Sequence, residues 1–162
     1  MVKKKNVHNI FSRTTLLSSV FAQKIQFMTK KEITQLSYEI IGYAIKVHKK
    51  LGPGLLEKIY EECLKYELEK NGYNVKQQIN IEIDYYDLEL SNPLRLDLLV
   101  NDCVIVELKT VEKFHPIDEA KLLTYMKLLS IPQGLLINFN TTNITKSTKP
   151  IVNEYFSRLA DD

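Results

Sequence analysis

The sequence predicts a mixed α/β domain, a sheet flanked by helices, with elements in the order α-α-β-β-β-α-β. Three observations support this class. Apolar residues recur at helical spacing over residues 33–71, the period changes to two at Val75, and a helical segment at 116–130 precedes a fully apolar run at 134–139. With 162 residues, of which 44% are hydrophobic and 26% charged, the chain can form one domain with a buried core.

A capping box opens the first expected helix. Thr29 is followed three residues later by Glu32, and Met28 is placed to pack on Ile33, so this helix begins directly after Met28. The helical period continues until Leu-Gly-Pro-Gly at residues 51–54 interrupts it.

Two further helices follow from the same period. One covers residues 55–71 and ends at Gly72, which suits the left-handed conformation that commonly ends a helix. The other covers residues 116–130 and has Pro116 in its first turn. Its expected apolar face consists of Ile117, Ala120, Leu123 and Met126.

Four strands are predicted, at residues 75–83, 94–100, 104–109 and 134–139. The first alternates apolar with polar residues and is expected to be half exposed, whereas the last is apolar throughout and is expected to be buried. The last twenty residues read as a polar tail with some helical character.

Charge is unevenly distributed along the chain. The net charge is +2, but residues 1–31 hold seven of the 22 basic residues and none of the 20 acidic ones, which leaves 15 minus 20, or −5, for the rest. We interpret residues 1–28 as a disordered basic extension or a misassigned start, residues 29–152 as the domain, and residues 153–162 as a tail. A domain of negative net charge is no generic basic binder, so contact with nucleic acid would need a local patch or bound cations.

The expected compartment is the cytoplasm. The two cysteines, Cys63 and Cys103, give no disulfide framework and no metal-finger spacing. No run of 18 apolar residues occurs, so we expect no membrane segment.

The second and third strands form a hairpin whose register follows from the apolar pattern. Leu96 and Leu98 share a face with Val106 and Leu108 only if the loop has three residues, 101–103, in which Asn and Asp accept the left-handed conformation. Leu96 then faces Leu108, and Leu98 faces Val106.

The same register brings like charges together on the other face, with Asp97 opposite Glu107 and Arg95 opposite Lys109. Each such pair destabilises a sheet by up to roughly 1 kcal/mol. A Mg²⁺ ion (or Mn²⁺) between the two carboxylates would compensate, and Lys109 could then position a water or stabilise charge on a phosphate. The alternative is that diagonal ion pairs, Asp97 with Lys109 and Arg95 with Glu107, cross a solvated face without any role.

Residues 54–60, Gly-Leu-Leu-Glu-Lys-Ile-Tyr, resemble the signature of the GxxExxY proteins, a family of the PD-(D/E)XK nuclease superfamily. The flanking sequence agrees with the resemblance, with Val-His-Lys at 47–49, Arg-Leu-Asp-Leu-Leu-Val at 95–100 and Val-Ile-Val-Glu-Leu-Lys at 104–109. The resemblance covers the chain from about Met28 to about Val152. It implies a restriction-endonuclease-like core with a central mixed sheet.

The resemblance also implies roles for particular residues. Asp97, Glu107 and Lys109 would form the catalytic site, in which Asp97 and Glu107 bind metal. Glu57 would be a further catalytic acid and metal ligand contributed by a helix. The alternative for Glu57 is ordinary capping, because acids are common in the first turn of a helix.

Four residues are expected to contact the substrate: Lys121, Tyr125, Tyr60 and Arg95. Lys121 and Tyr125 occupy positions where the family usually has a Gln and, four residues later, a Tyr, and they still share a helical face. A lysine binds phosphate as a point charge and cannot make the hydrogen bonds of an amide, so this departure bears on substrate placement.

Two functions stay open on the sequence alone. The first is a magnesium-dependent endo- or exonuclease that hydrolyses phosphodiester bonds of DNA with a metal-activated water. The second is a catalytically inactive nuclease-fold module that binds nucleic acid or a protein, which Lys121 and the negative charge of the domain motivate. A homodimer would suit either, because one small domain offers little surface to grip a duplex.

Overall fold

The computed structural model of the chain describes residues 13–83, 85, 86, 88, 90 and 94–162, so the first twelve residues of the expected extension lie outside it. Five strands form one sheet in the spatial order β1-β2-β3-β4-β5. They are β1 (Val75–Ile81), β2 (Leu94–Val100), β3 (Val104–Lys109), β4 (Gln133–Asn138) and β5 (Thr148–Val152). β3 and β4 are parallel, and the other neighbours in this sheet are antiparallel, so the sheet is mixed as predicted.

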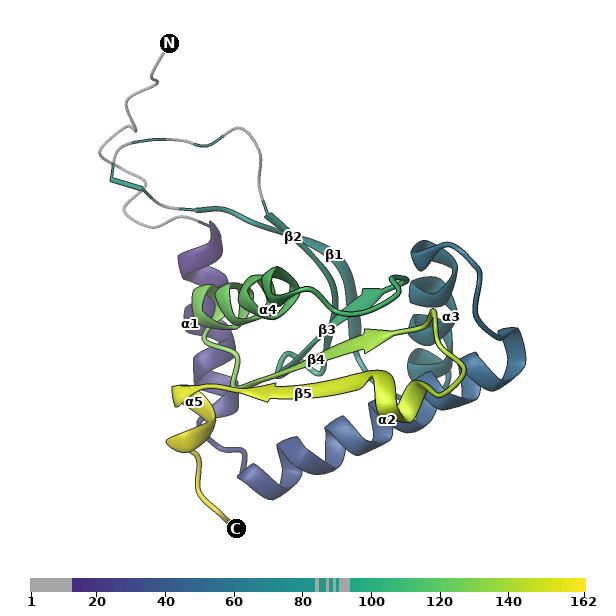
Figure 1. Ribbon diagram of the computed structural model, residues 1–162. Coiled ribbons are helices and arrows are strands. Elements are labelled where there is room, and N and C mark those ends of the chain that lie inside the picture. The colour runs from purple at the N-terminus through teal and green to yellow at the C-terminus, as the bar shows by residue number, and fades with distance from the viewer. Residues whose placement is uncertain (1–12, 84, 87, 89, 91–93) are drawn as a thin grey trace.

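Helices cover both faces of the sheet. They are α1 (Arg13–Ile25), α2 (Lys30–Leu51), α3 (Glu57–Lys70) and α4 (Pro116–Leu129), with the short η1 (Ile144–Ser147) and α5 (Glu154–Ser157) near the end. Figure 1 shows α4 on one side of the sheet and α2 on the other. α2 packs against α3, and α1 packs against α4. The predicted class, a mixed sheet flanked by helices, is confirmed.

The core lies on both sides of the sheet. Leu98 and Val106 face one layer of helices and Leu99 and Ile105 face the other, and all four are fully buried. The faces of β2 and β3 around Asp97 and Glu107 are therefore buried, which contradicts the alternative in which these acids lie on a solvated face. The carboxylates of Asp97 and Glu107 are consequently held in a medium of low polarity.

The caps and the hairpin follow the sequence closely. Thr29 and Glu32 form the predicted capping box on α2, and Gly72 follows α3 with a φ of 88°. Leu98 pairs with Val106 as predicted, and the loop between β2 and β3 has three residues. Asn101 and Asp102 in that loop have φ values of 51° and 62°, the left-handed conformation expected there.

Residues 13–25 form α1, so the expectation of disorder as far as residue 28 is wrong for this segment. Phe21 and Ile25 are buried in the core, with 1% and 4% of their surface exposed. The Thr14 hydroxyl accepts a hydrogen bond of 2.6 Å from the backbone N–H of Glu82, just after β1. This burial of apolar surface provides the free energy that orders the segment.

The apolar face of α4 also differs from the prediction. Leu122, Tyr125, Met126 and Leu129 are buried, whereas Ile117 and Leu123 are 64% and 40% exposed. The helix carries apolar residues on two stripes, so its period alone does not decide which stripe faces the sheet. The buried stripe is the one that packs over Gly134 of β4.

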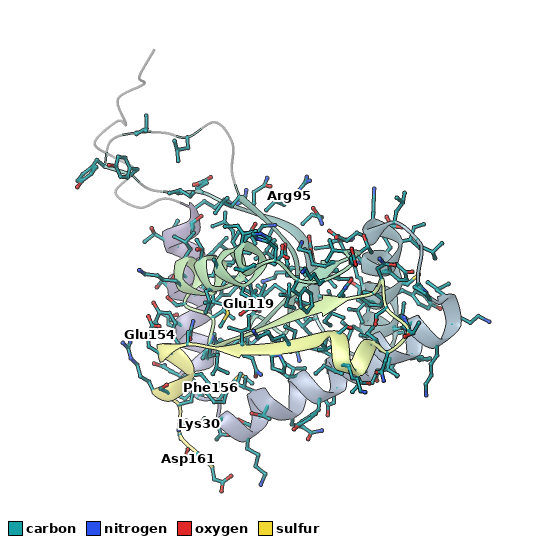
Figure 2. The ribbon with its side chains drawn as sticks, in the orientation of Figure 1. Lys30, Arg95, Glu119, Glu154, Phe156 and Asp161 are labelled. Carbon is teal, nitrogen blue, oxygen red and sulfur yellow. The ribbon has the colours of Figure 1, made fainter. Side chains whose placement is uncertain are left out.

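The polar tail contains more structure than expected. β5 pairs with β4, and α5 follows it directly. Ala160 forms a β-bridge with Thr29, and Lys30 makes an ion pair of 2.7 Å with Asp161 at the start of α2 (Figure 2). The C-terminal residues therefore dock onto the beginning of the domain.

Candidate active site

Asp97 and Glu107 project from neighbouring strands onto the α4 side of the sheet. The ladder between β2 and β3 has its last pair at Leu98 and Val106, one step before these acids. Beyond that pair, Asp97 Oδ2 accepts a hydrogen bond of 2.9 Å from the backbone N–H of Leu108. The carboxylate thus replaces a strand carbonyl as the acceptor, which fixes its position beside β3.

Glu107 is fully buried and has an uneven set of partners. Its Oε1 accepts hydrogen bonds from the ammonium groups of Lys109, at 3.1 Å, and Lys121, at 2.7 Å. Its Oε2 is buried without a hydrogen-bond partner. A buried carboxylate oxygen without a partner is costly, so this atom marks a place where a donor or a cation would be bound favourably.

Burial and neighbouring charges shift the pKa values of the groups at this site. Burial and the neighbouring charge of Glu107 raise the pKa of Asp97 to about 7, against the opposing effect of the Leu108 N–H. For Lys109 and Lys121, burial acts to lower the pKa, but the carboxylate of Glu107 leaves both pKa values above the ordinary lysine value. Both lysines are therefore cationic at neutral pH.

Neither of the diagonal ion pairs of the alternative interpretation is formed among the described residues. Lys109 pairs with Glu107 on its own strand, and Lys121 reaches the same carboxylate from α4. Arg95 lies exposed near the start of β2 (Figure 2). Lys109 and Lys121 therefore both pair with the buried Glu107, and neither forms one of the surface ion pairs of the alternative interpretation.

Glu57 lies in the first turn of α3, where burial raises its pKa while the charge of Lys109 opposes the rise. Among the described residues, no three His, Cys, Asp or Glu side chains lie close enough together to hold a metal ion. The structure thus does not gather Glu57 with Asp97 and Glu107 as a third ligand. Because the buried Tyr60 and Leu64 anchor α3 in the core, Glu57 instead lines the cleft beside the pair.

The cleft has a volume of about 630 Å³ and opens next to Asp97. Its lining residues are Glu57, Lys58, Glu61, Gln77, Gln78, Leu94, Arg95, Asp97, Lys121 and Tyr125. The Tyr125 hydroxyl donates to the carbonyl of Arg95 at 3.1 Å, and the Lys121 ammonium lies 5.3 Å from the Tyr125 ring centre. Three of the four expected substrate contacts, Lys121, Tyr125 and Arg95, therefore share one cleft.

Tyr60, the fourth, is not in the cleft. It is fully buried and stacks on Phe139 with 4.5 Å between ring centres. Its hydroxyl donates to the carbonyl of Gly52 at 2.6 Å and accepts from the N–H of Leu55 at 3.1 Å. Contact between Tyr60 and a substrate is thus contradicted, because the side chain is committed to holding the glycine-rich turn before α3.

Sequence reasoning missed Glu61, which is buried in α3 with 4% of its surface exposed. Its Oε1 accepts from the Gln77 amide at 2.7 Å, and both its oxygens accept from the Gln78 amide, at 2.7 and 2.8 Å. Gln78 also approaches Asp97 Oδ1 at 3.5 Å and has a φ of 52°, which is strained for a strand residue. The available signal was spacing, because Glu61 lies one helical turn after Glu57.

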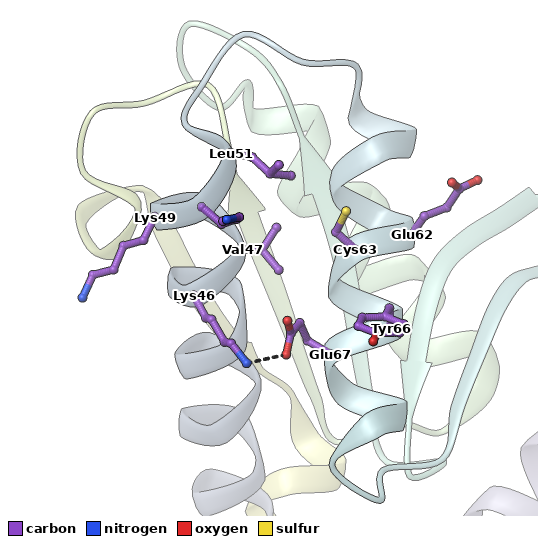
Figure 3. A pocket seen from close by; sticks show the side chains of 9 residues that line it. Lys46, Val47, Lys49, Leu51, Glu62, Cys63, Tyr66 and Glu67 are labelled. Atoms are coloured by element: carbon purple, nitrogen blue, oxygen red, sulfur yellow. Dashed lines mark hydrogen bonds and ion pairs between the residues drawn. The ribbon is translucent and has the colours of Figure 1, made fainter.

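A second cavity, of about 670 Å³, lies between α2 and α3 and is separate from the carboxylate pair. Val47, Leu51 and Cys63 line it, and Lys46 and Glu67 form an ion pair of 2.7 Å at its side (Figure 3). None of the predicted catalytic residues takes part in this cavity.

Comparison with known proteins supports the fold. The model of the PD-(D/E)XK nuclease superfamily matches residues 34–151. The chain belongs to this superfamily, and that membership suggests nuclease activity and interaction with nucleic acid.

Among solved structures, the chain is similar to that described as "Crystal structure of SSO0001", with 17% identity and a TM-score of 0.48 over 88% of this chain and 78% of that one. A search of curated proteins gives no significant match. Within the described part of the chain, no helix has both the length and the apolar character needed to cross a membrane.

Proposed function

We propose that this chain is a magnesium-dependent nuclease of the GxxExxY type that hydrolyses phosphodiester bonds of DNA. One observation carries the proposal: Oε2 of Glu107 is buried and unpartnered while Oε1 of the same carboxylate is bound by two lysines. Burying such a group is unfavourable in a purely structural role, whereas a cation beside the free oxygen would balance its charge.

The residues present fit a hard divalent cation. Asp97 and Glu107 would hold it, and two carboxylates suit Mg²⁺ (or Mn²⁺), which keeps several of its waters when bound. Such an ion would supply an activated water and neutralise the charge that develops on the leaving oxygen. Glu57, beside the pair, adds negative charge that favours a cation there.

Lys109, Lys121 and Arg95 would bind the phosphate groups of the substrate. Lys109 is held against Glu107, where its ammonium can orient a water or stabilise negative charge on the reacting phosphate. Arg95 and Lys121 line the cleft and offer positive charge to flanking phosphates. Tyr125 supports both, since its hydroxyl binds the Arg95 carbonyl and its ring lies under Lys121.

One observation favours the second candidate function, an inactive module that binds nucleic acid or a protein. Glu107 already has two lysine partners, so part of its charge is balanced without a metal ion. A module of this kind would keep the cleft and its cations but would not need a bound metal.

Cleavage assays with single- and double-stranded DNA and with RNA, in Mg²⁺ or Mn²⁺, test the proposal. We expect Asp97→Asn and Lys109→Ala each to lower the cleavage rate by about 100-fold or more, the size of effect seen when a preorganised electrostatic group is removed. The matched control is Lys58→Ala, because Lys58 lines the same cleft but is 80% exposed and pairs only loosely with Glu62. Equal cleavage by wild type and the two site variants would refute the proposed mechanism.

A metal titration separates the two candidate functions. If Asp97 and Glu107 bind Mg²⁺ or Mn²⁺ in the native state, the melting temperature rises with metal concentration, and Asp97→Asn removes the rise. An unchanged melting temperature in a protein that still binds nucleic acid would favour the inactive module.

A further inference from the structure

Lys121 has an unusual position for a cleft lysine. Its ammonium lies 2.7 Å from Glu107 Oε1, which also accepts from Lys109 at 3.1 Å. The Lys109 side chain is 13% exposed, whereas that of Lys121 is 40% exposed and lines the cleft. Glu107 therefore has one enclosed lysine partner and one that solvent and ligands can reach.

These two lysines would respond differently to a divalent cation at Glu107. A cation bound to this carboxylate through Oε2 would share it with both ammonium groups and would repel them. Lys109 is also held by a hydrogen bond of 3.1 Å to the Leu108 carbonyl, on its own strand. Lys121 reaches Glu107 from α4 on a long flexible side chain, so it is the partner that can leave.

The Tyr125 ring is placed to keep the Lys121 ammonium in the cleft after it leaves Glu107. The ring lies 5.3 Å from this ammonium, and an aromatic face attracts a cation. Tyr125 is bonded to the Arg95 carbonyl, and a Lys121 side chain that left Glu107 but stayed near this ring would remain in the cleft that Arg95 also lines. A phosphate bound there would meet two cations, which is the arrangement that recognises phosphate groups.

We propose that Lys121 is an exchangeable countercharge, which neutralises Glu107 in the empty site and moves to a nucleic-acid phosphate when a divalent cation binds Glu107. The phosphate half of this exchange rests on the proposed function. The exchange makes cation and nucleic acid bind cooperatively, because each favours the state in which Lys121 has left Glu107. Such coupling is reciprocal by thermodynamic necessity.

The first test measures Mn²⁺ binding by calorimetry without nucleic acid. Lys121→Gln removes the competing charge, so we expect it to bind Mn²⁺ about tenfold more tightly than the wild type, within the range typical of coupled sites. Lys58→Gln, which removes a charge from the same cleft without touching Glu107, is expected to bind Mn²⁺ as the wild type does. Lys121→Arg keeps the charge and is expected to keep the wild-type affinity.

The second test measures how a labelled DNA oligonucleotide binds, by fluorescence anisotropy, in EDTA and in Ca²⁺. We expect Ca²⁺ to strengthen binding by about tenfold in the wild type and in Lys58→Gln, and by several-fold less in Lys121→Gln. Melting curves in EDTA check that every variant is folded.

The outcomes are distinct. Equal or weaker Mn²⁺ binding by Lys121→Gln, or an unchanged effect of Ca²⁺ on DNA binding in that variant, overturns the exchange even if the wild type cleaves DNA. A wild type that cleaves no substrate, but shows the two expected changes in Lys121→Gln, overturns the catalytic proposal and supports the exchange.

Discussion

Asp97 is both hydrogen-bonded to the backbone and buried near a second carboxylate. Its Oδ2 is fixed by a backbone N–H, and its carboxyl group is buried near Glu107. Burial is the larger influence on its charge, so the group holds its proton to a pH of about 7. In the unfolded chain the same group titrates near its ordinary value of about 3.9.

This difference predicts how stability depends on pH in metal-free protein. As pH rises from about 4 to about 7, the unfolded chain loses the Asp97 proton while the folded chain keeps it, so the folded state is progressively disfavoured. The loss is complete above the folded pKa of about 7 and is at most on the order of 4 kcal/mol. Urea unfolding in EDTA from pH 4 to 8 measures it.

The comparison uses Asp97→Asn, which has no titrating proton at this position. Its stability relative to wild type should rise between pH 4 and pH 7 and then level off. Asp162→Asn, at a carboxyl that is 83% exposed, serves as the control and should run parallel to wild type. Parallel curves for Asp97→Asn as well would show that Asp97 is not destabilised by burial.

Some residues of the site could be predicted from the sequence and others could not. Asp97, Glu107 and Lys109 could be placed together because the strand period and the loop length leave one register. Glu61 could not be found in this way, since a charged residue in a helix is usually exposed. Its burial depends on Gln77 and Gln78 of β1, and the pairing of α3 with that strand is a tertiary fact.

At the scale of elements, prediction succeeded where local rules were unambiguous. The capping box of α2, the glycine after α3 and the hairpin of β2 and β3 each follow from a few neighbouring residues. α4 carries two apolar stripes, so the choice between them is made by the sheet. β5 was missed because Thr-Lys-Pro-Ile-Val has a proline and a lysine, which weaken any strand pattern.

The packing of α4 on β4 depends on the absence of a side chain at Gly134. A Cβ there would lie 2.8 Å from Leu122 Cδ1 and 2.9 Å from both Leu122 Cγ and Met126 Sδ. Leu122 and Met126 are fully buried and have little room to move. We expect Gly134→Ala to lower the free energy of unfolding by about 1–3 kcal/mol, the usual cost of overpacking a core.

Gly42 provides the matched control for this prediction. It lies in α2, is exposed, and a Cβ would meet nothing within 4 Å. Gly42→Ala should therefore stabilise the protein, by roughly 0.5–1 kcal/mol from helix propensity. Chemical denaturation of both variants gives the two values, and opposite signs are the expected result. A neutral Gly134→Ala would mean that α4 can shift away from β4.

At the scale of the whole molecule, α1 is an integral part of the fold. It was not predicted because its composition is basic and rich in Ser and Thr, and because no acidic residue marks its first turn. Besides the burial of its apolar residues, it makes contacts distant in the sequence: Ser18 hydrogen-bonds to Ser130 at 2.6 Å, and Lys24 pairs with Asp102 at 3.1 Å. Such contacts cannot be read from a local pattern.

Two phenylalanines test the contribution of α1. Phe21 is 1% exposed in the core, and Phe27, six residues later, is 82% exposed. We expect Phe21→Ala to reduce the free energy of unfolding by about 3–5 kcal/mol, as for other buried aromatic residues. Phe27→Ala should have almost no effect, and thermal or urea unfolding checks both. Similar small effects in the two variants would show that α1 is not needed for stability.

β5 also affects whether copies of this protein can associate by strand addition. It is the last strand of the sheet, and a border strand can recruit a strand from another molecule and so seed polymers. Pro150 has no backbone N–H to donate to an added strand, and Lys149 forms an ion pair of 2.6 Å with Glu119. The free side of β5 is therefore a poor template for strand addition. We expect growth by strand addition to be disfavoured on this side, even at the high concentrations used for crystallisation.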